Sequence, residues 1–176
     1  MNLIFRLLLL LIRSRKLQQI DPQQLAFFNF KVLPTDCDFN LHLTNSRYTS
    51  VLDLARTQYL MQVGAGRAIL FKGWVAVLAG QSISFFKEIK PFSRVTVTTQ
   101  VVYWDRRFCY IEHKFLVKGQ LHARALAKVV LIRARRVRAF DKFIEFIRPD
   151  MEAPEAPQIT PQIEAFKELL AVKKNS

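Results

Sequence analysis

Apolar and polar residues alternate over residues 26–33, and this alternation predicts a β-strand. Phe28, Phe30 and Val32 share one face of the segment, and Pro34 follows it. A period of two is typical of a strand with one buried face, and proline cannot continue the hydrogen-bond ladder of a sheet. We therefore expect a first strand that ends at Pro34.

The pattern becomes helical between Asn45 and about Val63. Apolar residues recur there every three or four positions, at Tyr48, Val51, Leu52, Ala55, Tyr59, Leu60 and Val63. This spacing predicts one amphipathic helix, and Gly64 supplies a stop signal. The apolar face of such a helix has to be covered by the rest of the chain.

Apolar segments rich in β-branched and aromatic residues follow the helix. They are residues 74–87, 95–103, 108–117 and 121–132. Their alternation predicts four antiparallel strands in a meander, with a hairpin turn at Lys118–Gln120. Gly80, inside the first of these strands, indicates a bulge or a point of close backbone approach.

Together the elements predict an α+β fold in which one long helix lies on one antiparallel sheet. The length is typical of a single domain, which we place at residues 21–148. Residues 1–20 form a basic, apolar N-terminal segment, and residues 149–176 a linker followed by a C-terminal helix. The packing face expected for that last helix consists of Ile163, Phe166, Leu169 and Leu170.

The composition is that of a globular protein, since 51% of the 176 residues are hydrophobic and 12% are aromatic. The two cysteines, Cys37 and Cys109, have no spacing that suggests a disulfide framework or a zinc site. This fits a reducing compartment, so we expect a cytoplasmic protein. The three histidines show no paired ligand spacing, and we expect neither a metal nor another cofactor.

The charge is strongly positive, with a formal value of +13. Such a field attracts polyanions, which include nucleic acids, anionic lipids and phosphate-bearing carriers such as coenzyme A. The sequence contains no zinc finger, glycine-rich phosphate loop or RNA-recognition signature. Nucleic-acid binding is therefore the weaker hypothesis.

The N-terminal segment combines the apolar run Leu7–Ile12 with Arg6, Arg13, Arg15 and Lys16. The run is too short to span a bilayer, and no small-residue cleavage site follows it. One hypothesis is that the segment lies on an anionic membrane surface, peripheral on the inner face of the membrane. The other is that it forms a helix packed on the domain or on a subunit interface. The sequence leaves both open.

Polar residues gather between the first strand and the predicted helix. They are Asp36, Asp38, Asn40, His42 and Asn45. The N-terminus of a helix presents unpaired N–H groups that stabilise an oxyanion, and a carboxylate beside it can activate water or attack a carbonyl itself. This combination favours acyl transfer to water.

The same residues also have structural interpretations. Thr44 and Asn45 are good helix N-caps, and aspartate and asparagine are common in loops. His42 fits the role of a base, a substrate ligand or a turn residue, and Cys37 has no feature that would lower its pKa. Residue chemistry alone leaves a catalytic loop and a structural loop as alternatives.

Longer motifs distinguish the alternatives. They are Asp36–Tyr48 followed by Asp53–Arg56, Ser82–Phe85 before Lys90–Phe92, and Trp104–Asp105 before Phe108–Phe115. These motifs resemble the 4-hydroxybenzoyl-CoA thioesterase-like branch of the hotdog superfamily, and within it the thioesterase-superfamily-member-6-like proteins. The resemblance covers roughly residues 28–132.

The resemblance implies a hotdog fold, with a sheet wrapped around one long helix, and an acyl-thioester hydrolase that uses coenzyme A or acyl-carrier-protein substrates. It implies that Asp38 is the catalytic carboxylate, that Asp36 supports it, and that the first amides of the helix near Asn45 form the oxyanion site. His42 is the third catalytic candidate. The candidates for substrate binding are Asn40, Tyr48, Arg56, Ser82 and Phe85.

The resemblance also implies a homodimer or a higher homo-oligomer with sheets joined edge to edge. Thr44 and Asp53 stand where many relatives have Asn and Glu, which alters the polar wall of the expected pocket. Tyr59, Phe85 and Phe86 favour a medium or long acyl chain. The alternative functions are a non-catalytic acyl-chain-binding, membrane-associated hotdog protein and a nucleic-acid-binding protein.

Overall fold

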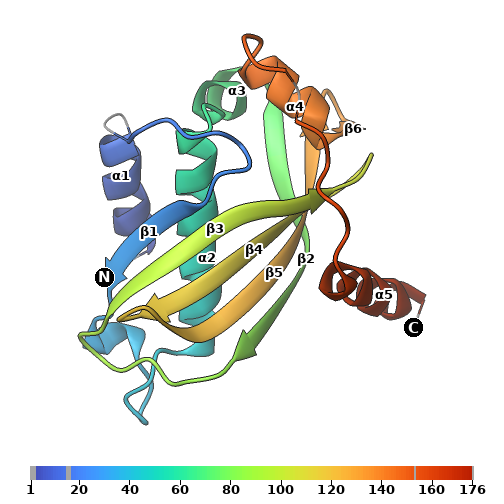
Figure 1. The fold of residues 1–176 in the computed structure, drawn as a ribbon. Coiled ribbons are helices and arrows are strands. Elements are labelled where there is room, and N and C mark those ends of the chain that lie inside the picture. The colour runs from blue at the N-terminus through green and yellow to red at the C-terminus, as the bar shows by residue number, and fades with distance from the viewer. Residues whose placement is uncertain (1–2, 15–16, 153, 176) are drawn as a thin grey trace. The chain divides into compact units, whose positions relative to one another are not determined.

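The computed structural model describes residues 3–14, 17–152 and 154–175, and Figure 1 shows their elements. In chain order these are α1 (Leu3–Ser14), β1 (Ala26–Lys31), the short 3-10 helix η1 (Pro34–Asp36), α2 (Asn45–Gln62), α3 (Gly66–Phe71), β2 (Trp74–Phe85), β3 (Arg94–Trp104), β4 (Cys109–Val117), β5 (Gln120–Arg133), β6 (Arg136–Arg138), α4 (Phe140–Ile147) and α5 (Pro161–Asn175). The α+β prediction is confirmed, and the bounds of the predicted strands and of the long helix agree with the observed ones to within two residues.

The sheet has the strand order β1-β3-β4-β5-β2, and β6 pairs with β5. β1 runs antiparallel to β3, from Ala26 opposite Thr99 to Lys31 opposite Arg94. The predicted meander is correct for β3, β4 and β5 but wrong for β2, which lies beyond β5. The cause is the connection at residues 86–93, which is too long for a tight hairpin and takes the chain past β5 and β4 to the position of β3 beside β1.

The chain folds as two compact units whose segments alternate along the sequence. The first unit comprises residues 1–64, 83–100 and 113–124. The second comprises residues 65–82, 101–112 and 125–176. Strands β2 to β5 each contribute residues to both units.

In the first unit, α2 buries its apolar stripe against the sheet. Tyr48, Leu52 and Tyr59 are buried, as predicted, whereas Leu60 is only partly buried. The rings of Tyr48 and Phe115 of β4 meet at a centroid distance of 4.9 Å with an edge-on geometry. The N-terminus of α2 therefore sits directly over the sheet, and the loop that precedes it is positioned by both.

The N-terminal segment forms the helix α1, which lies beside α2 (Figure 1). Leu10 is buried in this contact, whereas Phe5, Leu8 and Ile12 stay exposed. The positions of Arg15 and Lys16, and the side chain of Arg13, fall outside the described residues. In the portion of the chain that is described, no helix has the length and apolar character needed to cross a bilayer.

In the second unit, α5 packs through Ile163 and Phe166 on Tyr110 and Leu126 of the sheet. Leu169 was predicted on this face but is exposed, because a helix of this length presents only one narrow stripe to the sheet. The methyl groups of Leu170 lie so close to Gly80 that a Cβ there would be 2.8 Å from Leu170 Cδ1. Gly80 is thus a point of close approach, to a side chain rather than to backbone.

The helix α4 covers the tryptophans of the second unit. Its Phe143 ring lies 4.9 Å from the Trp74 ring, and its Phe140 ring lies 4.8 Å from the Trp104 ring, between centroids. The sequence pattern gave no prediction for α3 or α4, because helices of six and eight residues are too short to repeat their apolar period.

Candidate active site

The loop between η1 and α2 closes on itself around Asp38. Cys37 and Leu43 form an isolated bridge at its base, so we call residues 37–43 the Asp38 loop. Asp38 Oδ1 accepts hydrogen bonds from the N–H groups of Asn40 at 3.0 Å and His42 at 3.1 Å. The backbone N–H of Asp38 donates to the carbonyl oxygen of His42 at 2.9 Å. These bonds fix the direction of an exposed carboxylate, which is the arrangement a catalytic base requires.

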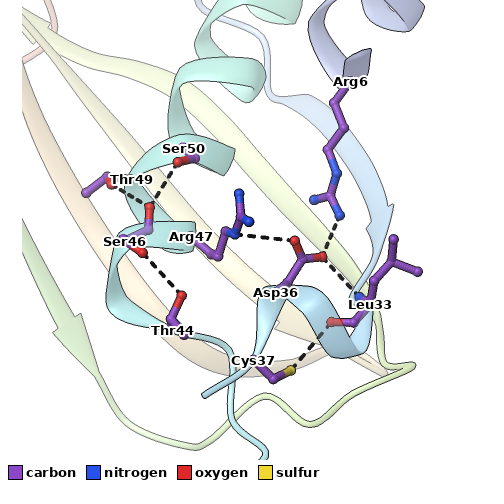
Figure 2. Close-up of polar contacts among 9 residues, drawn as sticks. All are labelled: Arg6, Leu33, Asp36, Cys37, Thr44, Ser46, Arg47, Thr49 and Ser50. Carbon is purple, nitrogen blue, oxygen red and sulfur yellow. Dashed lines mark hydrogen bonds and ion pairs between the residues drawn. The ribbon is translucent and has the colours of Figure 1, made fainter. Parts of the chain in front are cut away.

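Asp36, two residues earlier, has the opposite environment, as Figure 2 shows. Its side chain is 0% exposed and is paired with Arg6 of α1 and, at 3.5 Å, with Nε of Arg47 of α2. The N–H of Leu33 donates to Asp36 Oδ2 at 3.0 Å, and the N–H of Thr44 donates to the Asp36 carbonyl at 3.0 Å. Asp36 therefore holds the two ends of the Asp38 loop in place and has no access to a substrate.

The helix α2 begins at Asn45, just after this loop. Thr44 is the N-cap residue, but its side chain makes no capping hydrogen bond and instead lies 3.2 Å from the Ser46 hydroxyl. The N–H of Arg47 donates to the Thr44 carbonyl at 2.9 Å. The Arg47 N–H is thus engaged, and among the described residues Thr44 makes no side-chain cap, so the N–H groups of Asn45 and Ser46 are the candidates for binding an oxyanion.

A surface depression of about 320 Å³ lies where the Asp38 loop, α2 and the end of β2 meet. Its lining residues are Asp38, His42, Leu43, Asn45, Tyr48, Phe85, Phe86, Lys87, Glu88 and Ile89. Five of the eight residues predicted from the sequence, namely Asp38, His42, Asn45, Tyr48 and Phe85, are brought together here. The depression combines a carboxylate, a helix N-terminus and an aromatic wall.

Tyr48 and Phe85 form that aromatic wall. Their rings are 4.8 Å apart between centroids and meet edge-on. Burial raises the pKa of Tyr48 to about 12, so the phenol is neutral and can serve as a hydrogen-bond donor but not as a base at neutral pH.

Glu88 is a lining residue that the sequence did not predict. One of its carboxylate oxygens is 2.7 Å from His42 Nε2, and the other is 3.0 Å from Lys90 Nζ. The hydrogen bond from Lys90 and the charge of His42 lower the pKa of Glu88. Glu88 lies 46 positions beyond His42 in the sequence, so a local sequence motif cannot predict that the two side chains pair.

The other predicted site residues, Asn40, Arg56 and Ser82, are not among those that line the depression. Asn40 is exposed at the tip of the Asp38 loop, and Arg56 is largely buried on α2 and pairs with Asp53. Ser82 belongs to the second unit, on β2. Of these three residues, Asn40 contacts Asp38, through its backbone N–H.

Cys37 and a metal ion were the alternative sources of chemistry at this loop. Burial raises the pKa of the Cys37 thiol, and the charges of Asp36 and Asp38 raise it further. The thiol faces the Leu33 carbonyl at 3.6 Å. Within residues 3–14, 17–152 and 154–175, no group of three His, Cys, Asp or Glu side chains could hold a metal.

Comparison with known proteins places these features in a family. Residues 32–165 match the family described as the thioesterase-like superfamily. A probable thioesterase from Saccharomyces cerevisiae is 26% identical over 131 residues, covering 70% of this chain and 57% of that protein. Protein THEM6 from Xenopus laevis is 28% identical over 129 residues, covering 72% and 61%. The chain thus spans about three fifths of the length of these two relatives.

Solved structures share the fold at low sequence identity. A 1,4-dihydroxy-2-naphthoyl-CoA thioesterase from Synechocystis superimposes with a TM-score of 0.61 at 17% identity, over 74% of this chain and 100% of that one. A DHNA-CoA thioesterase from Staphylococcus aureus has a TM-score of 0.60 at 16% identity, over 86% and 94%. The hotdog fold is confirmed by this likeness. The family match covers about three quarters of the chain, from just after β1 into α5. The chain therefore belongs to the thioesterase-like superfamily.

Proposed function

We propose that the chain hydrolyses acyl thioesters at the depression beside Asp38. The observation that carries the proposal is the meeting of an exposed, oriented carboxylate with the uncapped N-terminus of α2 in one cavity. Family membership supports the same reaction class. Phe85 and Phe86, which also line the depression, supply apolar surface for the acyl group.

In the proposed reaction, Asp38 acts as a general base. It removes a proton from a water molecule, whose oxygen attacks the thioester carbonyl carbon. The first amides of α2, near Asn45, stabilise the oxyanion that develops on the carbonyl oxygen. Collapse of the tetrahedral intermediate breaks the carbon–sulfur bond, and the thiolate leaves and takes up a proton. Direct attack by Asp38 to form a mixed anhydride, which water then hydrolyses, is the alternative chemistry for the same residue.

Within this proposal, the acyl carrier is coenzyme A or acyl carrier protein. A second depression of about 600 Å³ adjoins the first, since Lys87 and Glu88 line both. Lys90, Lys118 and His122 complete its basic lining. Clustered lysines favour a phosphate-bearing group, which both carriers possess. His42 fits a substrate ligand better than a base, because Glu88 already engages its Nε2.

The decisive experiment measures thiol release from a panel of acyl-CoA substrates. Asp38→Asn keeps the shape of the side chain but removes the base, so we expect hydrolysis to fall by at least about 100-fold with no change in thermal stability. Asp150→Asn, on an exposed aspartate of the second unit, is the matched control and should keep full activity. Wild-type rates in Asp38→Asn at saturating substrate would refute the assignment. Tight acyl-CoA binding without turnover in the wild type would support the non-catalytic alternative.

We further propose that two copies associate through the edge strand β2. β2 ends the strand order, and its Val75, Val77 and Leu78 are exposed. An exposed apolar edge strand is a liability in a monomer unless another strand covers it. Sedimentation of the wild type should show a dimer or a larger homo-oligomer, and Val77→Lys should shift it toward monomer. A fully active wild-type monomer would exclude this assembly.

Peripheral attachment to an anionic membrane is a proposal that α1 still supports. Phe5, Leu8 and Ile12 form one exposed apolar stripe along this helix. The chain as a whole is strongly basic, which favours an anionic surface. We expect the full-length protein to co-sediment with anionic liposomes at low salt and the Leu8→Glu variant to stay in solution. Failure of the wild type to bind would assign the basic charge to substrate recognition instead.

A further inference from the structure

A further cavity, distinct from the two depressions described above, runs between α1, α2 and β1. Its volume is about 590 Å³, which falls within the usual range for small-molecule sites. The lining residues are Arg6, Leu9, Leu10, Leu17, Phe27, Phe28, Asn29, Phe30, Lys31, Leu33 and Gln58. None of them lines the depression beside Asp38. We call this cavity the α1 groove.

The walls of the α1 groove are apolar on both sides. The helix side and the segment that follows it contribute Leu9, Leu10 and Leu17. The strand side contributes Phe28 and Phe30, whose rings stack with centroids 6.1 Å apart. Such walls can bury a flexible hydrocarbon chain, because burial of each of its methylene groups is favourable.

The charged lining residues of the α1 groove are both basic. Arg6 is engaged by Asp36, and its guanidinium carbon lies 5.9 Å from the centre of the Phe30 ring. Lys31 is exposed, and its ammonium nitrogen lies 5.6 Å from the centre of the Phe92 ring. Among the described residues, no acidic side chain lines the groove. The charge therefore favours an anion at the Lys31 end and excludes a cationic head group.

We propose that the α1 groove binds a single long-chain fatty acid. The hydrocarbon chain lies between the leucines of α1 and the stacked phenylalanines of β1, and the carboxylate pairs with Lys31. This inference does not depend on thioester hydrolysis, because it concerns a site that shares no residue with the depression beside Asp38. A bound fatty acid would also hold α1 on the domain, since it adds contacts between α1 and β1.

Titration of the full chain with a fluorescent long-chain fatty acid tests the proposal, with palmitate as the competitor below its aggregation concentration. We expect saturable binding that palmitate displaces. Leu9→Trp, which fills the groove, should weaken binding by at least tenfold. Leu8→Trp, on the exposed face of the same helix, is the matched control and should bind like the wild type. Lys31→Gln should weaken palmitate binding several-fold and leave binding of methyl palmitate unchanged.

Photolabelling locates the ligand even if Leu9→Trp fails to fold. A fatty acid with a diazirine on its chain should label peptides that contain Leu9, Phe28 or Phe30 in the wild type. Labelling of the Phe85–Phe86 peptide alone would overturn the proposal and place the fatty acid in the candidate active site. Displacement by anionic phospholipid vesicles but not by palmitate would also overturn it, because the occupant would then be a membrane surface.

Discussion

Among the individual residues of the first unit, His113 has the environment that most strongly controls its charge. It is buried in β4, where its Nδ1 and the Thr99 hydroxyl are 2.9 Å apart. Its Nε2 has no hydrogen-bond partner within the described residues. Burial, and secondarily the charge of Arg56, lower the pKa of His113 from 6.5 to about 3. The ring is therefore neutral in the folded protein at physiological pH.

This environment predicts a specific response to acid. Below pH 6.5 the unfolded chain binds a proton at His113, whereas in the folded chain His113 is protonated only when the pH falls to about 3. The stability contributed by this group is intact above pH 6.5 and falls by about 1.4 kcal/mol per pH unit below it. In urea denaturation, the wild type should lose about 2 kcal/mol more than His113→Leu between pH 6.5 and pH 5.

His122→Leu is the matched control for this prediction, because His122 is partly exposed. It shows how much of any change comes from the loss of a histidine side chain as such. An identical pH dependence in His113→Leu and the wild type would show that other groups control the acid response.

At the scale of elements, Asp36 connects α1, η1 and the first turn of α2. Removing one partner of a buried ion pair leaves a charge that is buried without its partner, which destabilises the folded state. Removing both partners leaves no such charge. Arg47 would still face Asp36 in Arg6→Gln, so we expect this substitution to lower the free energy of unfolding by less than the roughly 3 kcal/mol of a wholly unpaired buried charge. Arg6→Gln combined with Asp36→Asn should recover much of that loss in a double-mutant cycle. Simple additivity of the two substitutions would indicate that the pair is not coupled.

The contact of α5 with the sheet gives a second prediction at this scale. Phe166 is buried against Tyr110, with ring centroids 6.5 Å apart, whereas Leu169 on the next turn is exposed. Phe166→Ala should cost about 3 kcal/mol of stability, because it leaves a cavity between α5 and the sheet. Leu169→Ala should change stability by less than about 0.5 kcal/mol. Thermal unfolding of both variants checks this difference.

At the scale of the whole molecule, the charge of +13 should govern the encounter with a charged substrate. We expect the KM for acyl-CoA to rise several-fold with salt while kcat stays nearly constant, because salt screens long-range attraction but not the chemical step. An acyl-pantetheine substrate lacks the phosphates of coenzyme A and provides the control. Equal salt dependence of KM for both substrates would show that attraction to phosphate is not involved.

Sequence alone predicted the elements that repeat their apolar period several times. The strand at 26–33, the helix at 45–63 and the three strands of the meander fall in this class. It did not predict the edge position of β2, because apolar alternation identifies a strand but does not determine which strands it pairs with. It also missed Glu88, whose contact with His42 depends on the tertiary fold.

The same limit applies to the two aspartates. The sequence placed Asp36 and Asp38 in one loop, and the resemblance assigned them different roles. Only the structure shows the physical difference, because Asp36 is buried between two arginines and Asp38 is exposed and held by its own loop. Arg6 reaches Asp36 from 30 positions away, which no local pattern can reveal.

The pairing of β1 with β3 has a consequence for how the chain emerges from the ribosome. Ala26 pairs with Thr99, which is synthesised 73 positions later. At translation rates of about 5–20 residues per second, β1 waits roughly 4–15 seconds before its complement has been made. During that interval Phe28 and Phe30 have no strand beside them. Nascent chains stalled shortly before Arg94 should therefore be strong clients of ribosome-associated chaperones, and release from the chaperone should follow synthesis of β3.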